Sequence, residues 1–228
     1  MSERTIVVVP CYNEAARFAA EEFRRALDDE PLLEFVLVDD GSRDATGQLL
    51  EQFQRDVGQR VEVVRLPQNR GKAEAVRAGV LRAFELGGAL IGYWDADLAT
   101  PLGVVPDFAK VLADPKIVLV LGSRVALLGR HVERDLRRHY MGRGFATLVS
   151  VGLGLRIYDT QCGAKLFRAN EVMQRAFAQR FEHSWTFDVE LLARLLNEQA
   201  QTGAIDVREQ CVELPLPEWR DKPGSRSA

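Results

Sequence analysis

Short apolar runs recur along the first half of the chain, and each is followed by a stretch with helical periodicity. The runs are rich in Val, Ile and Leu and lack alternating polar positions, which is typical of strands in a parallel sheet covered on both faces. We predict strands at residues 5–9, 35–38, 61–66, 90–94 and 117–121. We predict helices at residues 14–28, 45–56, 72–86 and 104–112. This alternation indicates an α/β fold with a mostly parallel, doubly wound sheet flanked by helices.

The pattern changes after residue 123. Residues 124–143 contain six arginines and two histidines but only two acidic residues. We predict a helix that ends near residue 151, then a strand near 165–168, helices at 170–179 and 187–199, and a last strand at 210–214. Because no repeat and no linker rich in Pro, Gly or Ser interrupts the chain, we predict one domain over residues 1–228, whose second half completes a pocket.

The composition narrows the class of protein. The formal net charge of −3 differs from the strongly basic balance of most nucleic-acid binders. Three widely spaced cysteines without a C-x-x-C pair indicate neither a disulfide framework nor a zinc site. The N-terminus does not resemble a signal peptide, and the apolar stretch at 145–155 is shorter than the ~20 residues that cross a bilayer. We therefore expect a cytoplasmic protein, soluble or peripheral to a membrane, that binds no nucleic acid.

Polar residues follow the predicted strands at the place where open α/β sheets bind ligands, beyond the carboxyl ends of the strands. The segments at these ends are VPCYNE, VDDGS, PQNRGK, WDADLATP and GSR. One such segment alone is more often a turn than a site, but their accumulation at one edge favours a ligand site. The chain lacks both a G-x-G-x-x-G after its first strand and a Walker loop, so bound phosphates would need a metal or arginines.

Asp95 and Asp97 are the most specific of these candidates. They stand one residue apart at the end of a buried run, where like charges repel unless solvent or a cation screens them. Hard cations such as Mg²⁺ or Mn²⁺ are commonly bound by one or two carboxylates together with substrate phosphates. D-x-D is also common in surface turns, but its position after a buried strand favours the metal-binding interpretation.

In order and spacing, VPCYNE, VDDGS, NRGKAEAVRAG, DADLATP and GSR resemble the family-2 glycosyltransferases. The segments YDTQCGAKLFR, WTFDVELLARL and EWRDKPGS resemble the branch that transfers sugars to polyprenyl phosphates, including the dolichyl-phosphate β-glucosyltransferases. The resemblance implies the nucleotide-diphospho-sugar transferase (GT-A, Rossmann-like) fold. It also implies inverting transfer of a hexose, glucose from a UDP-linked donor, to a polyprenyl or dolichyl phosphate at the membrane surface. Residues 1–123 would bind the nucleotide sugar and residues 124–228 the acceptor.

The resemblance also assigns roles to individual residues. Pro10, Tyr12 and Glu14 would line the base and ribose. Asp39 and Asp40 would bind the base or ribose, with Lys72 near the nucleotide. Asp95 would bind ribose and metal, and Asp97 the Mg²⁺ or Mn²⁺. Arg124 and Arg138 would hold the acceptor phosphate, with Arg143 as a third arginine.

The nature of the acceptor decides which of these groups act in the reaction. A phosphate monoester, with its second pKa of about 6, is mostly dianionic at neutral pH and needs no general base, only cations such as Arg124 and Arg138. A hydroxyl acceptor would need a base, for which Asp159 is the best candidate. Two further alternatives are a nucleotide-sugar-binding module without transfer activity, and a haloacid-dehalogenase-type phosphatase, in which D-x-D follows the first strand instead of the fourth.

Several neighbouring residues have simpler expected roles. Cys162 is expected in a buried turn, and Trp185 and Phe187 in the core. Asp188 and Glu190, at a helix start where acids are favoured, are expected to support the arginines.

Overall fold

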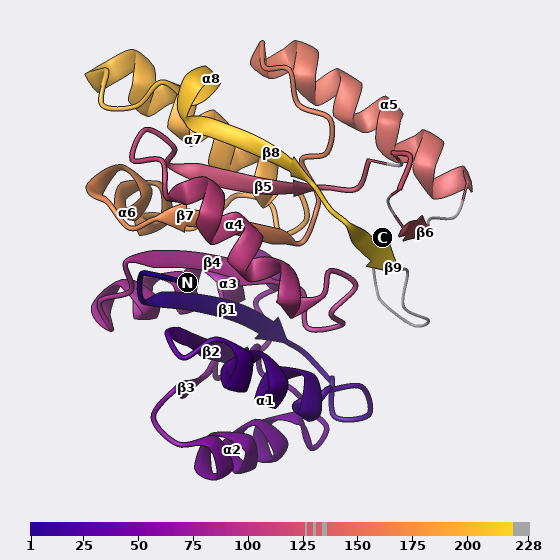
Figure 1. Ribbon diagram of the computed structural model, residues 1–228, viewed down its shortest axis with the longest axis vertical. Helices are drawn as coiled ribbons and strands as arrows, with labels where there is room; N and C mark the ends of the chain where they lie inside the picture. Colours follow the sequence, from indigo (N-terminus) through magenta and orange to yellow (C-terminus); the bar gives the residue numbers. More distant parts are fainter. Residues whose placement is uncertain (126, 130, 134–135, 221–228) are drawn as a thin grey trace.

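The computed structural model describes residues 1–125, 127–129, 131–133 and 136–220, without the side chains of 131–133, 136–143 and 145. A seven-stranded sheet runs through its centre (Figure 1). Its strand order is β3 (Val61–Arg65), β2 (Leu33–Asp39), β1 (Thr5–Cys11), β4 (Leu90–Trp94), β7 (Ala164–Arg168), β5 (Leu119–Ser123) and β8 (Cys211–Pro215). Only β7 runs antiparallel to its neighbours β4 and β5, so the prediction of a mostly parallel α/β sheet is confirmed.

Helices cover both faces of this sheet. Side chains of α1 (Ala20–Asp29), α2 (Thr46–Val57) and α4 (Val105–Leu112) pack in one apolar cluster, and those of α3 (Lys72–Glu85), α6 (Glu171–Ala178) and α7 (Phe187–Thr202) pack in the other. The strands supply both clusters in alternation, with Val7 and Val9 in the first and Ile6 and Val8 in the second. The approach of α3 to β1 requires Gly79, where an added Cβ would lie 2.3 Å from Val8 Cγ1.

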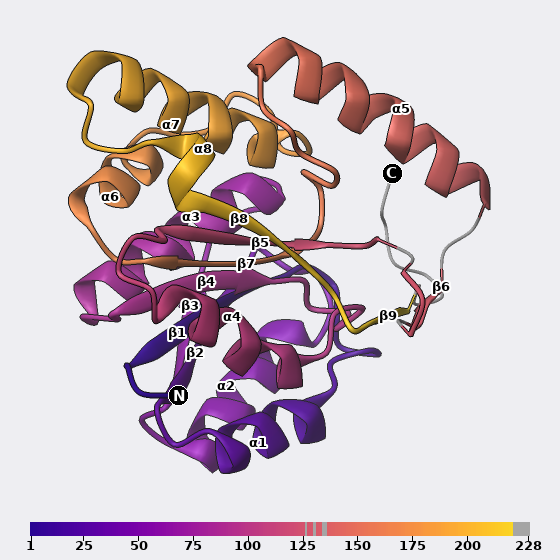
Figure 2. The same ribbon diagram turned by 45° about the horizontal axis from the view of Figure 1, so that its top comes forward.

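Five further elements complete the secondary structure of the described residues. They are the 3₁₀ helix η1 (Leu102–Val104), helices α5 (Leu136–Leu153) and α8 (Val207–Gln210), and the parallel pair β6 (His131–Glu133) and β9 (Glu218–Arg220). In both views α5 lies at the periphery of the molecule (Figures 1 and 2). Across the described part of the chain, no helix has the length and apolarity that a membrane span requires.

The first helix begins later than predicted. The sequence pattern predicted residues 14–28, whereas α1 begins at Ala20. The backbone of Asn13 adopts a left-handed conformation with φ 54°, and the N–H of Glu14 donates to Thr46 Oγ1 at 2.8 Å. The loop after β1 is thereby tied to the start of α2, and the turn around residue 14 does not continue as a helix.

Candidate functional site

The carboxyl ends of β1, β2, β4 and β5 lie at the same edge of the sheet because these strands are mutually parallel (Figure 1). This edge receives the polar segments that follow each strand, as the sequence predicted. The antiparallel strand β7 lies between β4 and β5, so the segment just before it, residues 159–163, also reaches this edge. The candidate site is therefore built from both halves of the chain.

Asp95, directly after β4, forms an ion pair with Lys72, the first residue of α3. Burial opposes the positive charge of Lys72, but the carboxylates of Asp95 and Asp188 outweigh it and raise the pKa of Lys72. The backbone of Gly163 packs against the Asp95 carboxylate so closely that an added Cβ would lie 1.9 Å from Oδ2. A protein cation and a glycine thus hold Asp95 in place.

Asp97 has a different environment. Its Oδ1 accepts a hydrogen bond from the N–H of Ala99 at 3.0 Å, across Leu98, whose backbone has φ 51°. Burial, and then the neighbouring Asp95 carboxylate, raise the pKa of Asp97. No salt bridge to Asp97 occurs within the described residues, so Asp97 is the carboxylate that a further cation would stabilise most.

The donor set fits Mg²⁺ or Mn²⁺ held partly by the substrate. Within the described part of the chain, no group of three or more His, Cys, Asp and Glu side chains could hold a metal ion. Asp95 and Asp97 supply one or two carboxylates, which is the usual protein share when a diphosphate completes the coordination. The chemistry of the pair therefore suits a hard divalent cation and not a closed, all-protein metal centre.

Asp39 and Asp40, at the end of β2, are buried and bonded to the protein backbone. Both carboxylate oxygens of Asp40 accept backbone N–H bonds at 2.8 Å, from Arg70 and from Gly71. Asp39 Oδ1 accepts the N–H of Ser42 at 2.9 Å. These contacts shape the loops after β2 and β3, and the role of the two carboxylates in base or ribose binding stays a prediction.

Pro10, Tyr12 and Glu14, at the end of β1, are all partly buried. Glu14 Oε1 accepts a hydrogen bond from Arg17 at 2.7 Å, whereas its buried Oε2 has no hydrogen-bond partner among the described residues. Burial raises the pKa of Glu14, and Asp97 adds to this shift. Glu14 therefore offers an acceptor oxygen beside the D-x-D pair.

Arg124 and Asp159 form a bidentate ion pair at the end of β5. Arg124 Nε lies 2.6 Å from Asp159 Oδ2, and its Nη2 lies 2.8 Å from Oδ1. The N–H groups of Arg124 and Gln161 also donate to this carboxylate, at 3.1 and 3.2 Å. The N–H of Asp159 in turn donates to Glu213 Oε1 on β8 at 2.8 Å. The structure thus brings together two residues that the sequence proposed for alternative reactions.

Arg138 and Arg143 lie on α5 by position, but their side chains are outside the described residues. The prediction that they hold an acceptor phosphate remains a prediction. Arg124 itself packs over the ring of Trp219 on β9, with 5.4 Å between Cζ and the ring centroid. The Arg124 guanidinium therefore packs against β9.

A buried ionic cluster next to the D-x-D pair was not predicted from the sequence. Lys165 Nζ on β7 lies 2.7 Å from Asp188 Oδ1, and Tyr93 Oη on β4 donates to the same oxygen at 2.5 Å. The expectation that Asp188 supports arginines was wrong, because its contacts are with Lys165 and Tyr93. A lysine within the apolar strand AKLFR was the available signal.

The other expectations for this segment had mixed outcomes. Cys162 is fully buried, and Phe187 is 1% exposed, as predicted. Trp185 was wrongly expected in the core, since it is 53% exposed. Glu190 pairs with Arg194 on its own helix at 2.7 Å and not with the arginines after β5.

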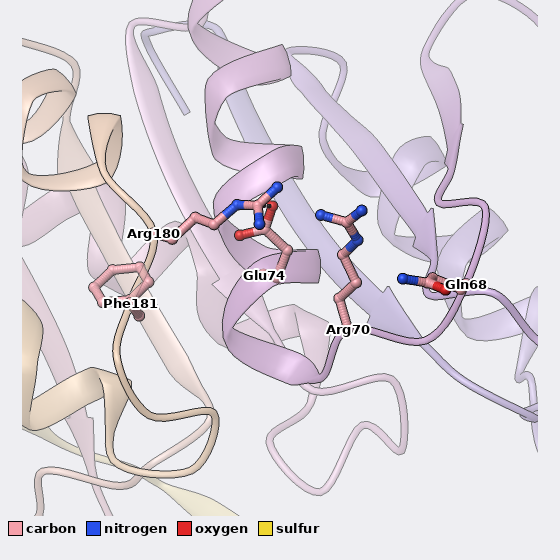
Figure 3. A pocket seen from close by; sticks show the side chains of 5 residues that line it. All are labelled: Gln68, Arg70, Glu74, Arg180 and Phe181. Carbon is pink, nitrogen blue, oxygen red and sulfur yellow. Dashed lines mark ion pairs between the residues drawn. The ribbon is translucent and has the colours of Figure 1, made fainter.

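A pocket of about 400 Å³ borders the same edge (Figure 3). Its lining residues are Gln68, Arg70, Glu74, Arg180 and Phe181. Arg70 and Arg180 extend on either side of Glu74, with Arg180 Nε 3.6 Å from Glu74 Oε1. The pocket adjoins the loop that Asp40 holds but includes neither carboxylate of the D-x-D pair.

Solved structures share this fold. Glucosyl-3-phosphoglycerate synthase from Mycobacterium tuberculosis, crystallised with Mn²⁺, UDP and glucosyl-3-phosphoglycerate, superposes with a TM-score of 0.64 at 21% identity, over 97% of this chain and 74% of that one. A mannosyltransferase from Pyrobaculum calidifontis with GDP-Man and Mn²⁺ gives 0.60 at 21% identity, over 98% and 59%. The predicted GT-A fold is confirmed, and the phosphatase alternative is contradicted because D-x-D follows β4.

Sequence relatives agree with the fold. Residues 6–173 match Glycosyl transferase family 2. Dolichyl-phosphate beta-glucosyltransferases from Mus musculus, Trichomonas vaginalis and Homo sapiens are 34%, 32% and 35% identical, over 96%, 89% and 82% of this chain. The alignments span 68%, 63% and 61% of those relatives. On this evidence, the chain belongs to glycosyl transferase family 2.

Proposed function

We propose that this protein is an inverting, metal-dependent glycosyltransferase that moves glucose from a UDP-linked donor to a polyprenyl or dolichyl phosphate at a membrane surface. The observation that carries the proposal is the arrangement of charge at the sheet edge. Asp97 needs a further cation beside the Lys72–Asp95 pair, and Arg124 stands at the end of β5, on the other side of β7. Relatives at 32–35% identity named dolichyl-phosphate beta-glucosyltransferase support this choice of sugar and acceptor.

On the donor side, the chain would bind the nucleotide and its diphosphate. When bound at Asp97, Mg²⁺ or Mn²⁺ would neutralise negative charge on the departing diphosphate. Lys72 holds Asp95 in a fixed orientation, and the Glu14 carboxylate lies beside the D-x-D pair, where it would contact the ribose. These groups are fixed before the donor arrives, so little reorganisation is needed when negative charge develops.

On the acceptor side, the described residues offer the cation Arg124, and the carboxylate beside it, Asp159, is already occupied by hydrogen bonds. A phosphate monoester is already a nucleophile at neutral pH, and it must be held close to an anionic diphosphate. Arg124 uses Nε and Nη2 for Asp159, and its Nη1 has no hydrogen-bond partner among the described residues. The pair with Asp159 orients the guanidinium, so that Nη1 can donate to the phosphate.

The alternative with a hydroxyl acceptor receives less support from the geometry. As a general base, Asp159 would have to accept a proton while both of its oxygens take hydrogen bonds from Arg124 and two backbone N–H groups. Both oxygens are therefore already engaged by donors of the protein, and a proton from the acceptor would have to displace one of them. We assign Asp159 to the orientation of Arg124.

Exposed apolar residues support an acceptor embedded in a membrane. Leu128, in the loop after β5, is fully exposed, and Leu148 and Val151 on α5 are 75% and 77% exposed. Leu128 lies within the arginine-rich residues 124–143, and Leu148 and Val151 follow them. Apolar side chains beside a cluster of cations suit the interface of a bilayer that contains anionic lipids.

The proposal is tested by a transfer assay with crossed substrates. UDP-glucose, UDP-galactose and GDP-mannose are offered with Mn²⁺, Mg²⁺ or chelator, and with a short polyprenyl phosphate or the corresponding alcohol as acceptor. We expect metal-dependent transfer from UDP-glucose to the phosphate and none to the alcohol. Transfer to the alcohol would support a hydroxyl acceptor instead, and tight donor binding without any transfer would support the binding-module alternative.

A further inference from the structure

Lys165 is the fully buried cation of the described core, with an exposed fraction of 0%. Its Nζ contacts Asp188 Oδ1 at 2.7 Å and donates to the carbonyl oxygen of Cys162 at 2.8 Å. Tyr93 donates to the same Asp188 oxygen at 2.5 Å, and its ring centroid lies 5.3 Å from Lys165 Nζ. We call Tyr93, Lys165 and Asp188 the buried triad.

The buried triad is connected to Asp95 by two routes. Along β4, Tyr93 lies two residues before Asp95. Across the sheet, Lys165 holds the Cys162 carbonyl, and the next residue, Gly163, accepts the N–H of Asp95 at 3.0 Å. The backbone of Gly163 also touches the Asp95 carboxylate, as the clash of an added Cβ shows. Strand β4 and the turn before β7 therefore meet at Asp95. The buried triad fixes β4 through Tyr93 and the turn through the hydrogen bond from Lys165 to the Cys162 carbonyl.

Stability alone accounts poorly for this arrangement. The desolvation of two charges offsets much of the free energy that their attraction contributes. A protein with well-packed apolar residues in place of a buried ion pair is often equally stable. A pair of charges does, however, impose a geometry that apolar contacts do not.

We propose that Tyr93, Lys165 and Asp188 are positioning residues that set the orientation of the Asp95–Asp97 pair for Mn²⁺ and the donor diphosphate. This inference deepens the proposed function and rests on its donor site, but it does not depend on the identity of the acceptor. None of the three residues needs to touch the donor. Residues that orient metal ligands typically change metal affinity by about 10–100-fold when they are replaced.

Two variants separate positioning from folding. Tyr93→Phe removes one hydroxyl and leaves the ring in the core. The double variant Lys165→Met with Asp188→Leu replaces both charges by apolar side chains, so that no unpaired charge remains buried. The matched control is Arg168→Leu, at the other end of β7, which removes the 3.2 Å contact with Glu3.

The measurement is binding of Mn²⁺ in the presence of UDP, followed by electron paramagnetic resonance and by titration calorimetry, with thermal unfolding recorded in parallel. We expect the folded double variant to bind Mn²⁺ with UDP at least about tenfold more weakly than the wild type, and Tyr93→Phe to show a smaller loss of the same kind. Arg168→Leu is expected to keep wild-type affinity even where its Tm falls.

Wild-type affinity in the folded double variant would overturn the inference and leave the triad a support of the core. If the double variant does not fold, Tyr93→Phe decides, and wild-type affinity in that variant would overturn the inference equally. If Arg168→Leu loses as much Mn²⁺ affinity as the double variant, any disturbance of β7 weakens binding. That result would also contradict a positioning role for the triad. If the wild type itself shows no Mn²⁺-dependent UDP binding, the proposed donor site fails and the inference falls with it.

Discussion

At the scale of single residues, neighbouring carboxylates receive different partners. Asp95 is paired with Lys72, whereas Asp97 has no salt bridge among the described residues and its pKa is raised by burial and by Asp95. The difference explains how two like charges can end a buried strand. Asp95 is balanced by a lysine of the protein, and Asp97 is the carboxylate that we propose for the metal ion.

Asp97→Ala is expected to reduce transfer by at least about a hundredfold and to abolish the effect of Mn²⁺ on nucleotide-sugar binding. Its Tm should equal or exceed that of the wild type, because the substitution removes repulsion with Asp95. Initial rates and calorimetric titrations with and without Mn²⁺ check this, with the exposed Asp107→Ala on α4 as control. Full activity in Asp97→Ala would place the metal elsewhere.

Arg138→Ala is expected to lower kcat/KM for the polyprenyl phosphate by about tenfold to a hundredfold and to leave donor affinity unchanged. A hydrogen bond between a guanidinium and a phosphate is worth about 1.5–3 kcal/mol, and a lysine at this position should restore it only in part. Steady-state kinetics with each substrate varied in turn provide the measurement, and Arg25→Ala on α1 is the control. A loss confined to donor binding would remove Arg138 from the acceptor site.

At the scale of elements, apolar runs predicted most strands and helices, but not how distant segments pair. A strand near residues 165–168 was expected, yet its antiparallel insertion between β4 and β5 follows from pairing across the whole sheet. That register sets Lys165 opposite Tyr93. The lysine in the apolar strand AKLFR was a local signal, but its partners in the buried triad could not be predicted from local patterns. The same holds for the start of α1, which depends on long-range hydrogen bonds.

The start of α3 contains an ion pair, Glu74–Arg77, whose contribution to the free energy of unfolding depends on pH. Arg77 donates to Glu74 through Nε and Nη2 at 2.8 and 3.0 Å, and this hydrogen bonding lowers the pKa of Glu74 below its ordinary value of 4.5. A lowered folded-state pKa stabilises the protein above pH 4.5, and the gain is lost as pH falls through the lowered value.

Glu74→Gln should therefore lower the free energy of unfolding by about 1–2 kcal/mol at pH 7 and make little difference near pH 3. Thermal unfolding of both proteins across this pH range is the measurement. Glu21→Gln, whose side chain is 91% exposed, should show no such trend. If the free energy of unfolding of Glu74→Gln stays below that of the wild type by the same amount down to pH 3, the charge of Glu74 does not contribute to stability.

Helix α5 exposes the apolar side chains of Leu148 and Val151. Polar substitutions at these two positions should therefore weaken membrane binding more than they destabilise the fold. Leu148→Gln combined with Val151→Gln should weaken co-sedimentation with anionic vesicles by about tenfold or more, because transfer of each side chain from water contributes binding energy. Leu32→Gln, at an exposed position before β2, is the control. Unchanged sedimentation with the double variant would exclude this face of α5 from the membrane contact.

At the scale of the whole molecule, the candidate site joins both halves of the chain. The first half supplies Lys72, Asp95 and Asp97, which the sequence predicted because parallel strands share a carboxyl edge. The second half supplies the Arg124–Asp159 pair, whose members were predicted separately and for different acceptors. Sequence spacing cannot show that Arg124 bonds both carboxylate oxygens of Asp159. This contact favours a phosphate acceptor over a hydroxyl acceptor.

The central claim is that glucose passes directly to a lipid phosphate with inversion. Its most direct test is the NMR spectrum of the product formed from UDP-α-glucose, a short polyprenyl phosphate and Mn²⁺. We expect a β-glucosyl phosphodiester, with coupling between the anomeric proton and phosphorus. An α-linked product, a glucosyl ether without phosphorus coupling, or free glucose as the sole product would contradict it.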